Sequence, residues 1–216
     1  STQSRSSAAS DVYKRQMHNG KKIGVIAVQD GPGIEASFSA VAQAYGDNTP
    51  ILMLPGAHSL AMQDYDPQFM ASRSFKDITK MAGLINDAGS ISRKFEMAFS
   101  ALKNSKTGPV LLETTVNVLW GQSDEESKKE YRSPAGHRSM ADPDDVERTL
   151  DTLLDAKCPI IIAGHGVLYA EAWDELRQLA ELLQIPVTTS LLGKSAFPEN
   201  HDLALGVSGR TITKAA

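Results

Sequence analysis

Apolar residues occur along the chain in short continuous runs that alternate with segments of helical spacing. Runs at residues 22–28 (KIGVIAV), 50–56 (PILMLPG) and 108–119 (GPVLLETTVNVL) are typical of strands buried in a parallel sheet. Between the first two runs, apolar residues recur at spacings of three and four, which predicts one helix face. The residues of that face are Ile34, Phe38, Val41, Ala42 and Tyr45. This alternation favours an α/β fold with a doubly wound parallel sheet.

Two further segments before residue 108 have helical spacing. We expect helices over residues 75–85 and 90–102, the second with Ser90 as its N-cap. Glu113 interrupts the third apolar run, so we expect it either at a cleft or at an edge of the sheet.

The pattern breaks between residues 120 and 141, where charged residues, Ser and Pro replace apolar ones. We interpret this segment as a solvated, extended linker. The alternation then restarts with a helix, a strand over residues 158–167, a helix over 170–183 and a strand over 185–193. The apolar face of the first of these helices consists of Val146, Leu150, Leu153 and Leu154.

The chain therefore reads as two tandem Rossmann-like α/β domains, over residues 17–119 and 142–216, joined by the linker at 120–141. Residues 1–16 are polar and lack periodicity, and we interpret them as an adapter-derived or disordered tail. The sequence begins and ends abruptly, so we expect both domains to be truncated and the chain to be a fragment.

Composition narrows the classes of protein to consider. The chain has 216 residues and a net charge of -4, which argues against binding to nucleic acid or to an anionic membrane. The apolar runs are shorter than a membrane-spanning helix requires. A single cysteine, Cys158, fits a reducing cytoplasm, and its apolar surroundings predict a small buried side chain.

Two glycine-containing turns follow predicted strands. Gly31-Pro32-Gly33 lacks the third glycine of the dinucleotide fingerprint, because Ala36 occupies that position, and no P-loop lysine follows. The turn still directs helix N-terminal amides toward the carboxyl end of a strand. A ligand site and a tight turn without a ligand both remain open on local evidence.

The second turn, Gly164-His165-Gly166, also follows a strand and also lacks the third glycine. We expect His165 to be an exposed loop residue rather than a catalytic base. The other histidines, including His58 and His201, are scattered without the spacing of metal ligands, so the sequence predicts no metal site.

The order of the segments resembles a known enzyme family. Residues 20–56, from GKKIGVIAV through the Gly-Pro-Gly turn to ILMLPG, resemble the pyrimidine-binding domain of thiamine-diphosphate-dependent enzymes of the acetolactate synthase-like group. The segments DITK at 77–80 and RKFEMAFSALKNSKTGPVLLE at 93–113 continue the resemblance. Residues 156–209, AKCPIIIAGHGVLYA onward, are similar to the first half of that family's central domain.

The resemblance implies a fragment of a lyase or carboligase that acts on small-molecule 2-oxo acids with thiamine diphosphate and Mg²⁺. It places Gly31, Pro32 and Gly33 beside the cofactor's pyrimidine ring. Gly164 and Gly166, which follow a strand of the central domain, are a candidate nucleotide site, and whether that domain binds FAD stays open. It implies no catalytic residue and no metal ligand within this chain, because the family's activating glutamate lies upstream and its magnesium motif lies in a later domain. The fragment alone is expected to be inactive, and the whole protein to be a homodimer or homotetramer.

The sequence also departs from the family's pattern. Glu35 and Ala36 stand where the family often has Thr-Asn, and residues 70–72 (Met-Ala-Ser) stand where acetolactate synthases usually have Phe-Gln-Glu. Glu113 replaces an aspartate. These departures leave the substrate open. Two other hypotheses are an NAD- or FAD-type nucleotide-binding module without thiamine chemistry, and a non-catalytic subunit of the same fold.

Overall fold

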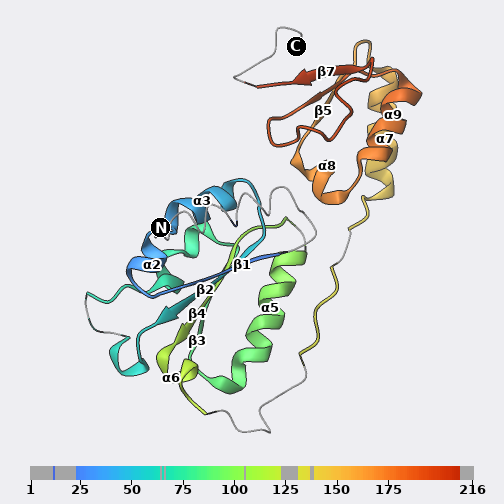
Figure 1. The fold of residues 1–216 in the computed structure, drawn as a ribbon. Coiled ribbons are helices and arrows are strands. Elements are labelled where there is room, and N and C mark those ends of the chain that lie inside the picture. Colours follow the sequence, from blue (N-terminus) through green and yellow to red (C-terminus); the bar gives the residue numbers. More distant parts are fainter. Residues whose placement is uncertain are drawn as a thin grey trace. The chain divides into compact units, whose positions relative to one another are not determined.

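The structure is a computed structural model that describes residues 12, 23–63, 65, 67–104, 106–122, 131–136 and 139–209. The predicted tail at residues 1–16 lies outside these ranges, apart from Val12. The chain divides into two compact units, residues 1–139 and 140–216, which are described separately here (Figure 1).

The first unit is built on a four-stranded parallel sheet. Its strands are β1 (Gly24–Val28), β2 (Ile51–Ala57), β3 (Met81–Ile85) and β4 (Val110–Thr115), in the spatial order β1-β2-β4-β3. In register, Val28 lies opposite Pro55 at the carboxyl end of the β1–β2 pair, and Thr114 lies opposite Ile85 at the end of the β3–β4 pair. The carboxyl ends of all four strands therefore meet at one edge of the sheet.

Helices cover both faces of this sheet (Figure 1). The short helix α2 (Pro32–Glu35), α3 (Phe38–Gly46) and α4 (Ala71–Ser74) contribute to one apolar core, and α5 (Ile91–Lys103) contributes to the other. The connection through α5 returns across the sheet, because β4 inserts between β2 and β3. Connections between parallel strands of one sheet are right-handed. A connection that runs back across the sheet therefore lies on the opposite face, so α5 lies on the face opposite α2 and α3. The parallel, doubly wound α/β arrangement is confirmed.

Side chains of β2 supply both cores in turn. Ile51 and Met53 pack with the α2–α3 helices, whereas Leu52 and Leu54 pack with α5. Successive residues of a strand point to opposite faces, so a strand covered on both faces must be apolar throughout. This requirement explains the continuous apolar run PILMLPG.

The prediction of a helix over residues 75–85 is wrong. The structure has a 3₁₀ turn at η2 (Lys76–Ile78), and then the strand β3, which pairs with β4 along its whole length. The segment MAGLI is too short for periodicity to distinguish a buried strand from a helix, and its pairing with β4 decides the outcome.

The predicted helix face after β1 is only partly correct. Residues 34–45 form two helices, α2 and α3, rather than one. Ile34 and Val41 are fully buried, but Phe38 and Tyr45 are exposed. The break between α2 and α3 interrupts the helical spacing, so the residues of the single predicted face do not all reach the core.

The third predicted strand is also shorter than expected. β4 ends at Thr115, and Val116–Leu119 forms the helical turn α6. Ser90 occupies the N-cap position of α5 after the turn η3 (Ala88–Ser90), but its hydroxyl donates to the Asp87 carbonyl oxygen and makes no hydrogen bond to an α5 amide.

Part of the predicted linker lies against the first unit. The Lys103 ammonium group, at the end of α5, donates to Ser133 Oγ at 2.7 Å and to the Pro134 carbonyl oxygen at 3.1 Å. The ring of Tyr131 lies 6.0 Å from the ring of Phe99 on the same helix. Residues 131–136 are therefore held on α5, although they form no helix or strand.

The second unit contains a three-stranded parallel sheet in the order β5-β6-β7. Its core joins the sheet to helices α8 and α9, through Ala163, Ala180 and Val187 among others. In chain order the elements are α7 (Pro143–Asp155), β5 (Ile161–Ala163), α8 (His165–Ala170), α9 (Trp173–Leu183), β6 (Val187–Thr189) and β7 (Ala204–Val207).

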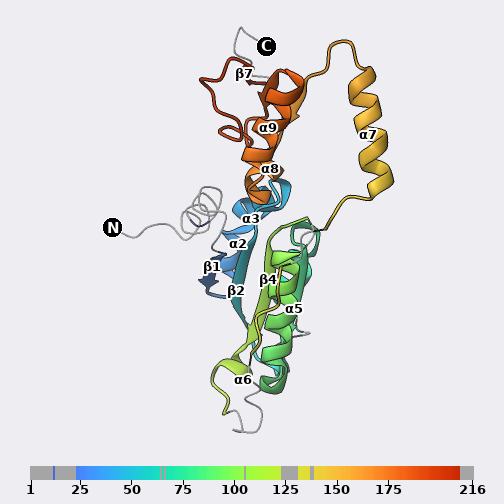
Figure 2. The same cartoon turned by 90° about the vertical axis from the view of Figure 1, so that its right-hand side faces the viewer.

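Helix α7 begins with a regular N-cap, because the Asp142 carboxylate accepts a hydrogen bond from the Asp144 amide. Its predicted apolar residues Val146, Leu150 and Leu154 are exposed, and Figure 2 shows α7 apart from α8 and α9. The prediction that Cys158 is buried is wrong: it is exposed, since β5 begins only at Ile161 and Cys158 precedes the sheet.

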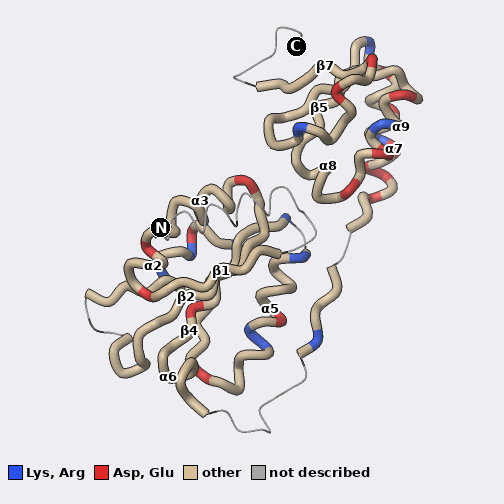
Figure 3. The backbone as a smooth tube through the Cα atoms, in the orientation of Figure 1, with Lys and Arg blue, Asp and Glu red and all other residues tan. Residues whose placement is uncertain are grey.

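Acidic and basic residues are interspersed along α5 and α9 (Figure 3). None of the helices within the described ranges is both long enough and apolar enough to cross a membrane.

Leu111, a fully buried residue of the central strand β4, provides a test of this fold. We expect Leu111→Ala to lower the free energy of unfolding by about 3 kcal/mol, because the substitution leaves a cavity in a core that cannot collapse around it. Urea denaturation followed by circular dichroism measures the loss.

The matched control is Leu182→Ala on α9, where the leucine is 79% exposed. This variant is expected to change the free energy of unfolding by less than about 0.5 kcal/mol. Equal effects of the two substitutions would contradict the placement of β4 in the centre of the sheet.

Candidate functional site

A cavity of about 670 Å³ lies at the carboxyl edge of the first sheet. All four strands reach it, and α5 and α6 close it from the side of the second core. Most of the lining is apolar, and Asp30 is the one charged residue among those that line it. The lining residues are Ala27, Val28, Gln29, Asp30, Leu54, Pro55, Gly56, Ala57, Ile85, Ile91, Phe95, Thr114, Val116, Val118 and Leu119.

The strand order explains why a cavity forms here. β2 and β4 are neighbours, but the chain after β2 leads to α4 on one face of the sheet, whereas Val118 after β4 packs on the opposite face. Segments that diverge in this way leave a crevice above the strand ends, which is where ligands bind in open α/β sheets.

The Gly31-Pro32-Gly33 turn directly follows the cavity-lining residues Gln29 and Asp30, but is not itself part of the lining. Gly31 has a φ of 59°, which favours glycine, and its carbonyl oxygen accepts from the amides of Ile34 and Glu35. A Cβ atom on Gly33 would lie 3.1 Å from Gln29 Cβ, so a side chain there would press on the segment that borders the cavity. The turn thus positions Gln29 and Asp30.

Asp30 and His58 face each other at the same edge. His58 Nδ1 lies 3.5 Å from Asp30 Oδ2, and the two side chains are 44% and 32% exposed. Each residue comes just after one of two adjacent parallel strands, β1 and β2, and this adjacency brings them together. In the sequence, His58 is one of several histidines that lack the spacing of metal ligands. Its position directly after a predicted buried strand is the sequence feature that could have marked it as a site residue.

Glu113 anchors the loop that follows His58. The residue lies in the middle of β4, is 2% exposed, and accepts hydrogen bonds from the Ala71 amide at 3.0 Å and the Ser72 amide at 2.8 Å. Glu113 was expected at a cleft or at an edge of the sheet: it lies on a central strand, not at an edge, and its carboxylate borders a second, small cavity of about 10 Å³. That cavity is also lined by Ala57, His58, Gln63, Gln68, Phe69 and Met70.

In the second unit, Gly164 follows β5 as expected, but Gly166 lies within α8 rather than in a turn. His165 is half-buried, and its ring centroid lies 4.4 Å from that of Tyr169, with the two rings tilted by 43°, so the expectation of an exposed loop residue is wrong. Gly193 packs tightly on the end of β5, because a Cβ atom there would lie 2.5 Å from the Ala163 carbonyl oxygen. Gly164 and Gly193 therefore lie together at the carboxyl edge of the second sheet.

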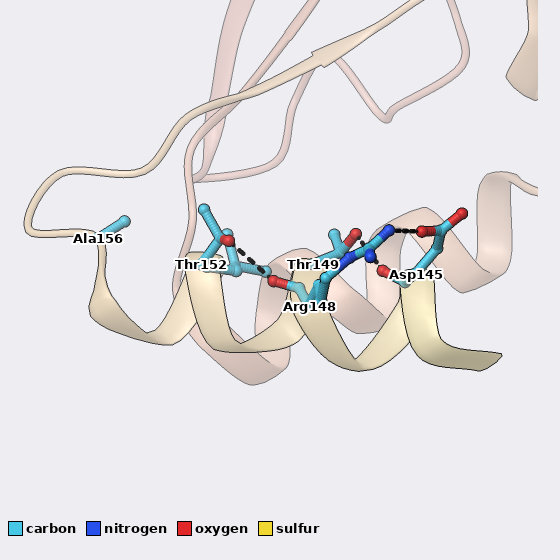
Figure 4. A pocket seen from close by; sticks show the side chains of 6 residues that line it. Asp145, Arg148, Thr149, Thr152 and Ala156 are labelled. Carbon is cyan, nitrogen blue, oxygen red and sulfur yellow. Dashed lines mark hydrogen bonds and ion pairs between the residues drawn. The ribbon is translucent and has the colours of Figure 1, made fainter. Parts of the chain in front are cut away.

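A shallow hollow of about 600 Å³ runs along α7, and Figure 4 shows the side chains of α7 and of Ala156 that line it. Its polar groups bond within the helix itself: Arg148 pairs with Asp145, and the hydroxyl groups of Thr149 and Thr152 donate to the carbonyl oxygens four residues earlier. This hollow shows no convergent polar groups of the kind that bind a ligand. Within the described ranges, no group of three or more His, Cys, Asp or Glu residues is placed to hold a metal ion.

The first unit has a cavity at the carboxyl edge of its parallel sheet, and a second parallel α/β unit follows it in the chain. Comparison with protein-family models identifies the units. Residues 3–81 match the N-terminal TPP binding domain of thiamine pyrophosphate enzymes, and residues 146–216 match the central domain of the same enzymes. The chain belongs to the thiamine pyrophosphate enzyme family.

Within this family, the chain is similar to curated acetolactate synthases and to a glyoxylate carboligase. The chain is 34% identical to a protein of Methanocaldococcus jannaschii named "Probable acetolactate synthase large subunit", over 89% of this chain and 34% of that protein. It is 28% identical to acetolactate synthase isozyme 3 large subunit of Escherichia coli, over 87% of this chain and 34% of that one. Glyoxylate carboligase of Escherichia coli O157:H7 is 29% identical, over 87% and 32%. The chain thus spans about a third of the length of these relatives.

A solved structure from Mycobacterium smegmatis, described as a thiamin diphosphate-dependent enzyme, has the same fold. It superposes with a TM-score of 0.74 at 24% identity, over 97% of this chain and 40% of that chain.

The anchoring role of Glu113 can be tested by its removal. We expect Glu113→Ala to lower the free energy of unfolding by about 3 kcal/mol, because two amides lose a charged acceptor in a buried place. Glu113→Gln retains one acceptor oxygen and should cost about half as much. Chemical denaturation of the three proteins measures the series.

The control is Glu175→Ala, which removes an exposed carboxylate on α9 and should cost less than about 0.5 kcal/mol. A Glu113→Ala variant as stable as this control would show that the carboxylate does not hold the loop.

Proposed function

We propose that the whole protein is a thiamine-diphosphate- and magnesium-dependent carboligase or lyase that acts on 2-oxo acids, in the manner of acetolactate synthases. The cavity at the carboxyl edge of the first sheet carries this proposal. It lies in the unit that matches the TPP binding domain, and a pyrimidine ring is the part of the cofactor that we place there.

The lining of this cavity fits a flat aromatic ring. Apolar side chains, among them Leu54, Phe95 and Leu119, offer contact surface, while Gln29 and Asp30 offer polar atoms at one side. Binding sites for small molecules commonly combine an apolar wall with a few polar groups in this way. In this proposal Gly31, Pro32 and Gly33 act by setting the backbone beside the ring.

Thiamine diphosphate, when bound, supplies a carbon nucleophile and an electron sink for decarboxylation of a 2-oxo acid. The residues of this chain would bind and orient the ring and exclude water from it. We place the diphosphate and Mg²⁺ in a domain that these 216 residues do not include, as the resemblance to the family implies. Accordingly, we expect no turnover from the 216-residue chain alone.

A second ligand at the central domain stays a prediction. Gly164 lies at the carboxyl edge of the second sheet, close to Gly193, and a nucleotide such as FAD would bind at such an edge. Gly166, inside α8, supports this site less well than Gly164. The hypothesis of a nucleotide-binding module without thiamine chemistry is not favoured, because both units match domains of thiamine pyrophosphate enzymes.

We also propose a cytoplasmic homodimer or homotetramer. Large apolar side chains are exposed on two segments. One is η1 (Leu60–Met62), and the other is α6 with the following residue, Trp120. The two segments are tied together, since the Leu60 amide donates to Asn117 Oδ1 at 2.9 Å. Exposed patches of this kind mark protein interaction sites. The exposed residues are Leu60, Met62, Tyr65, Val116, Leu119 and Trp120.

The cavity assignment is tested by filling the cavity in the full-length protein. Ala27, an exposed residue of β1, lines the cavity, whereas Val25 points to the same face two residues earlier and lies outside the lining. We expect Ala27→Phe to weaken thiamine diphosphate binding by about tenfold or more, because the larger side chain would clash with the bound ring. A loss of about 1.4 kcal/mol of binding free energy corresponds to a tenfold weaker affinity. Val25→Phe should leave it unchanged.

The measurements are titration of cofactor-free protein with thiamine diphosphate and Mg²⁺, and consumption of pyruvate or another 2-oxo acid. A full-length protein that neither binds the cofactor nor consumes any 2-oxo acid would falsify the proposed function. Turnover by the 216-residue chain alone would show that the diphosphate and metal sites lie within it.

The oligomer is tested separately by analytical ultracentrifugation of the full-length protein. Trp120→Ser, at the most exposed aromatic residue of the patch, should weaken self-association, since aromatic residues dominate interface energetics. Trp173→Ser, on α9 in the second unit, is the control. A monomeric wild-type protein would overturn this part of the proposal.

A further inference from the structure

Two side-chain amide groups beside the small cavity have buried polar atoms without partners. Gln63 Nε2 and Gln68 Oε1 are both buried, and neither makes a hydrogen bond within the described part of the chain. Both residues line the small cavity, together with Glu113. Buried polar side-chain atoms are nearly always hydrogen-bonded in folded proteins, so two exceptions at one cavity point to a bound molecule.

The backbone holds both glutamines in the segment between β2 and α4. The Gln63 amide donates to the Leu60 carbonyl oxygen at 3.4 Å, and the Gln68 amide donates to the Tyr65 carbonyl oxygen at 2.9 Å. On the other side of the cavity, Glu113 belongs to the central strand β4. The small cavity therefore lies between the segment after β2 and the sheet itself.

The polar atoms around the cavity require a ligand that both accepts and donates hydrogen bonds. Gln63 Nε2 is a donor, whereas Gln68 Oε1 and the Glu113 carboxylate are acceptors. The Ala71 and Ser72 amides occupy two of the roughly four acceptor positions that a carboxylate offers, which leaves about two for a ligand. The two acceptors disfavour an anion, and the amide donor disfavours a metal cation.

The volume of the cavity limits the ligand to one very small molecule. The cavity measures about 10 Å³. A single water molecule needs a volume of about 10–15 Å³ on this scale, so one water fits and a larger ligand does not. Buried waters typically make about three hydrogen bonds. One bond accepted from Gln63 and two donated, to Gln68 and Glu113, make three.

We infer that the small cavity is a binding site for one water molecule. This water accepts a hydrogen bond from Gln63 Nε2 and donates to Gln68 Oε1 and to the Glu113 carboxylate. It links the segment after β2 to β4 at the edge of the sheet where the large cavity lies, because Ala57 lines both cavities. The inference is independent of the proposed function, since it needs neither cofactor nor substrate.

The first experiment detects the water by NMR of the 216-residue chain with ¹⁵N-labelled glutamine. The side-chain amide protons of Gln63 should show a nuclear Overhauser effect to water with the sign of a long-lived bound molecule. Gln178, an exposed glutamine of α9, is the control and should show the opposite sign, which is that of rapidly exchanging surface water. A Gln63 amide group without the long-lived signal overturns the inference.

The second experiment is a double-mutant cycle that tests whether the two glutamines share the water. We expect Gln63→Met and Gln68→Met each to lower the urea midpoint of unfolding, because each variant removes one partner of the water. The double variant should lose less than the sum, since it removes both polar groups that need the water.

The matched control pairs Gln63→Met with Gln178→Met, and the two losses should add because Gln178 lies on α9 in the second unit. Losses that also add for Gln63→Met and Gln68→Met overturn the shared water.

Discussion

The pairing of β4 between β2 and β3 is the constraint on which the first unit depends. Once β4 occupies that place, the chain must return across the sheet after β3, and a right-handed return requires α5 on the face opposite α2 and α3. Both faces of the central strands are then covered, which is why β2 and the first half of β4 (residues 110–112) are apolar on both sides. The same reversal opens the crevice at the carboxyl edge, where the cavity lies.

The central strand also carries the polar group that organises the site. Glu113 is buried in β4 and accepts both of its hydrogen bonds from the start of α4, which fixes the end of the loop that begins at His58. A buried carboxylate is tolerated only where such partners satisfy it. The glycine turn fixes the other side, since the packing of Gly33 on Gln29 places Asp30. Backbone anchors on two adjacent strands thus bring Asp30 and His58 together.

Much of the fold could be predicted from the pattern of apolar residues. Runs such as IGVIAV and VLL predict the strands after Lys22, before Ala57 and within residues 108–119. A strand that is buried on both faces shows a continuous apolar run, and such a run is recognisable in the sequence. β3 could not be predicted, because MAGLI is short and its helical or extended state is decided by β4. The burial of Cys158 could not be predicted either, because apolar neighbours in the sequence do not show at which residue a strand begins. Cys158 precedes β5 and is exposed.

The candidate site was predictable only in part. The order of segments was enough to indicate a thiamine-diphosphate-dependent enzyme, and the Gly31-Pro32-Gly33 turn directly follows Gln29 and Asp30, which line the cavity. The site itself depends on residues 28 positions apart or more, such as Asp30 with His58 and Glu113 with Ala71.

By itself, then, the sequence determined the fold class and the alternation of its elements, because these follow from periodicity within short segments. The resemblance to the family was carried by the order and the residues of whole segments. Only the tertiary structure decided the strand order, the burial of Glu113 and the pairing of Asp30 with His58. These depend on which strands become neighbours, and hydrogen bonding between strands distant in the chain settles that.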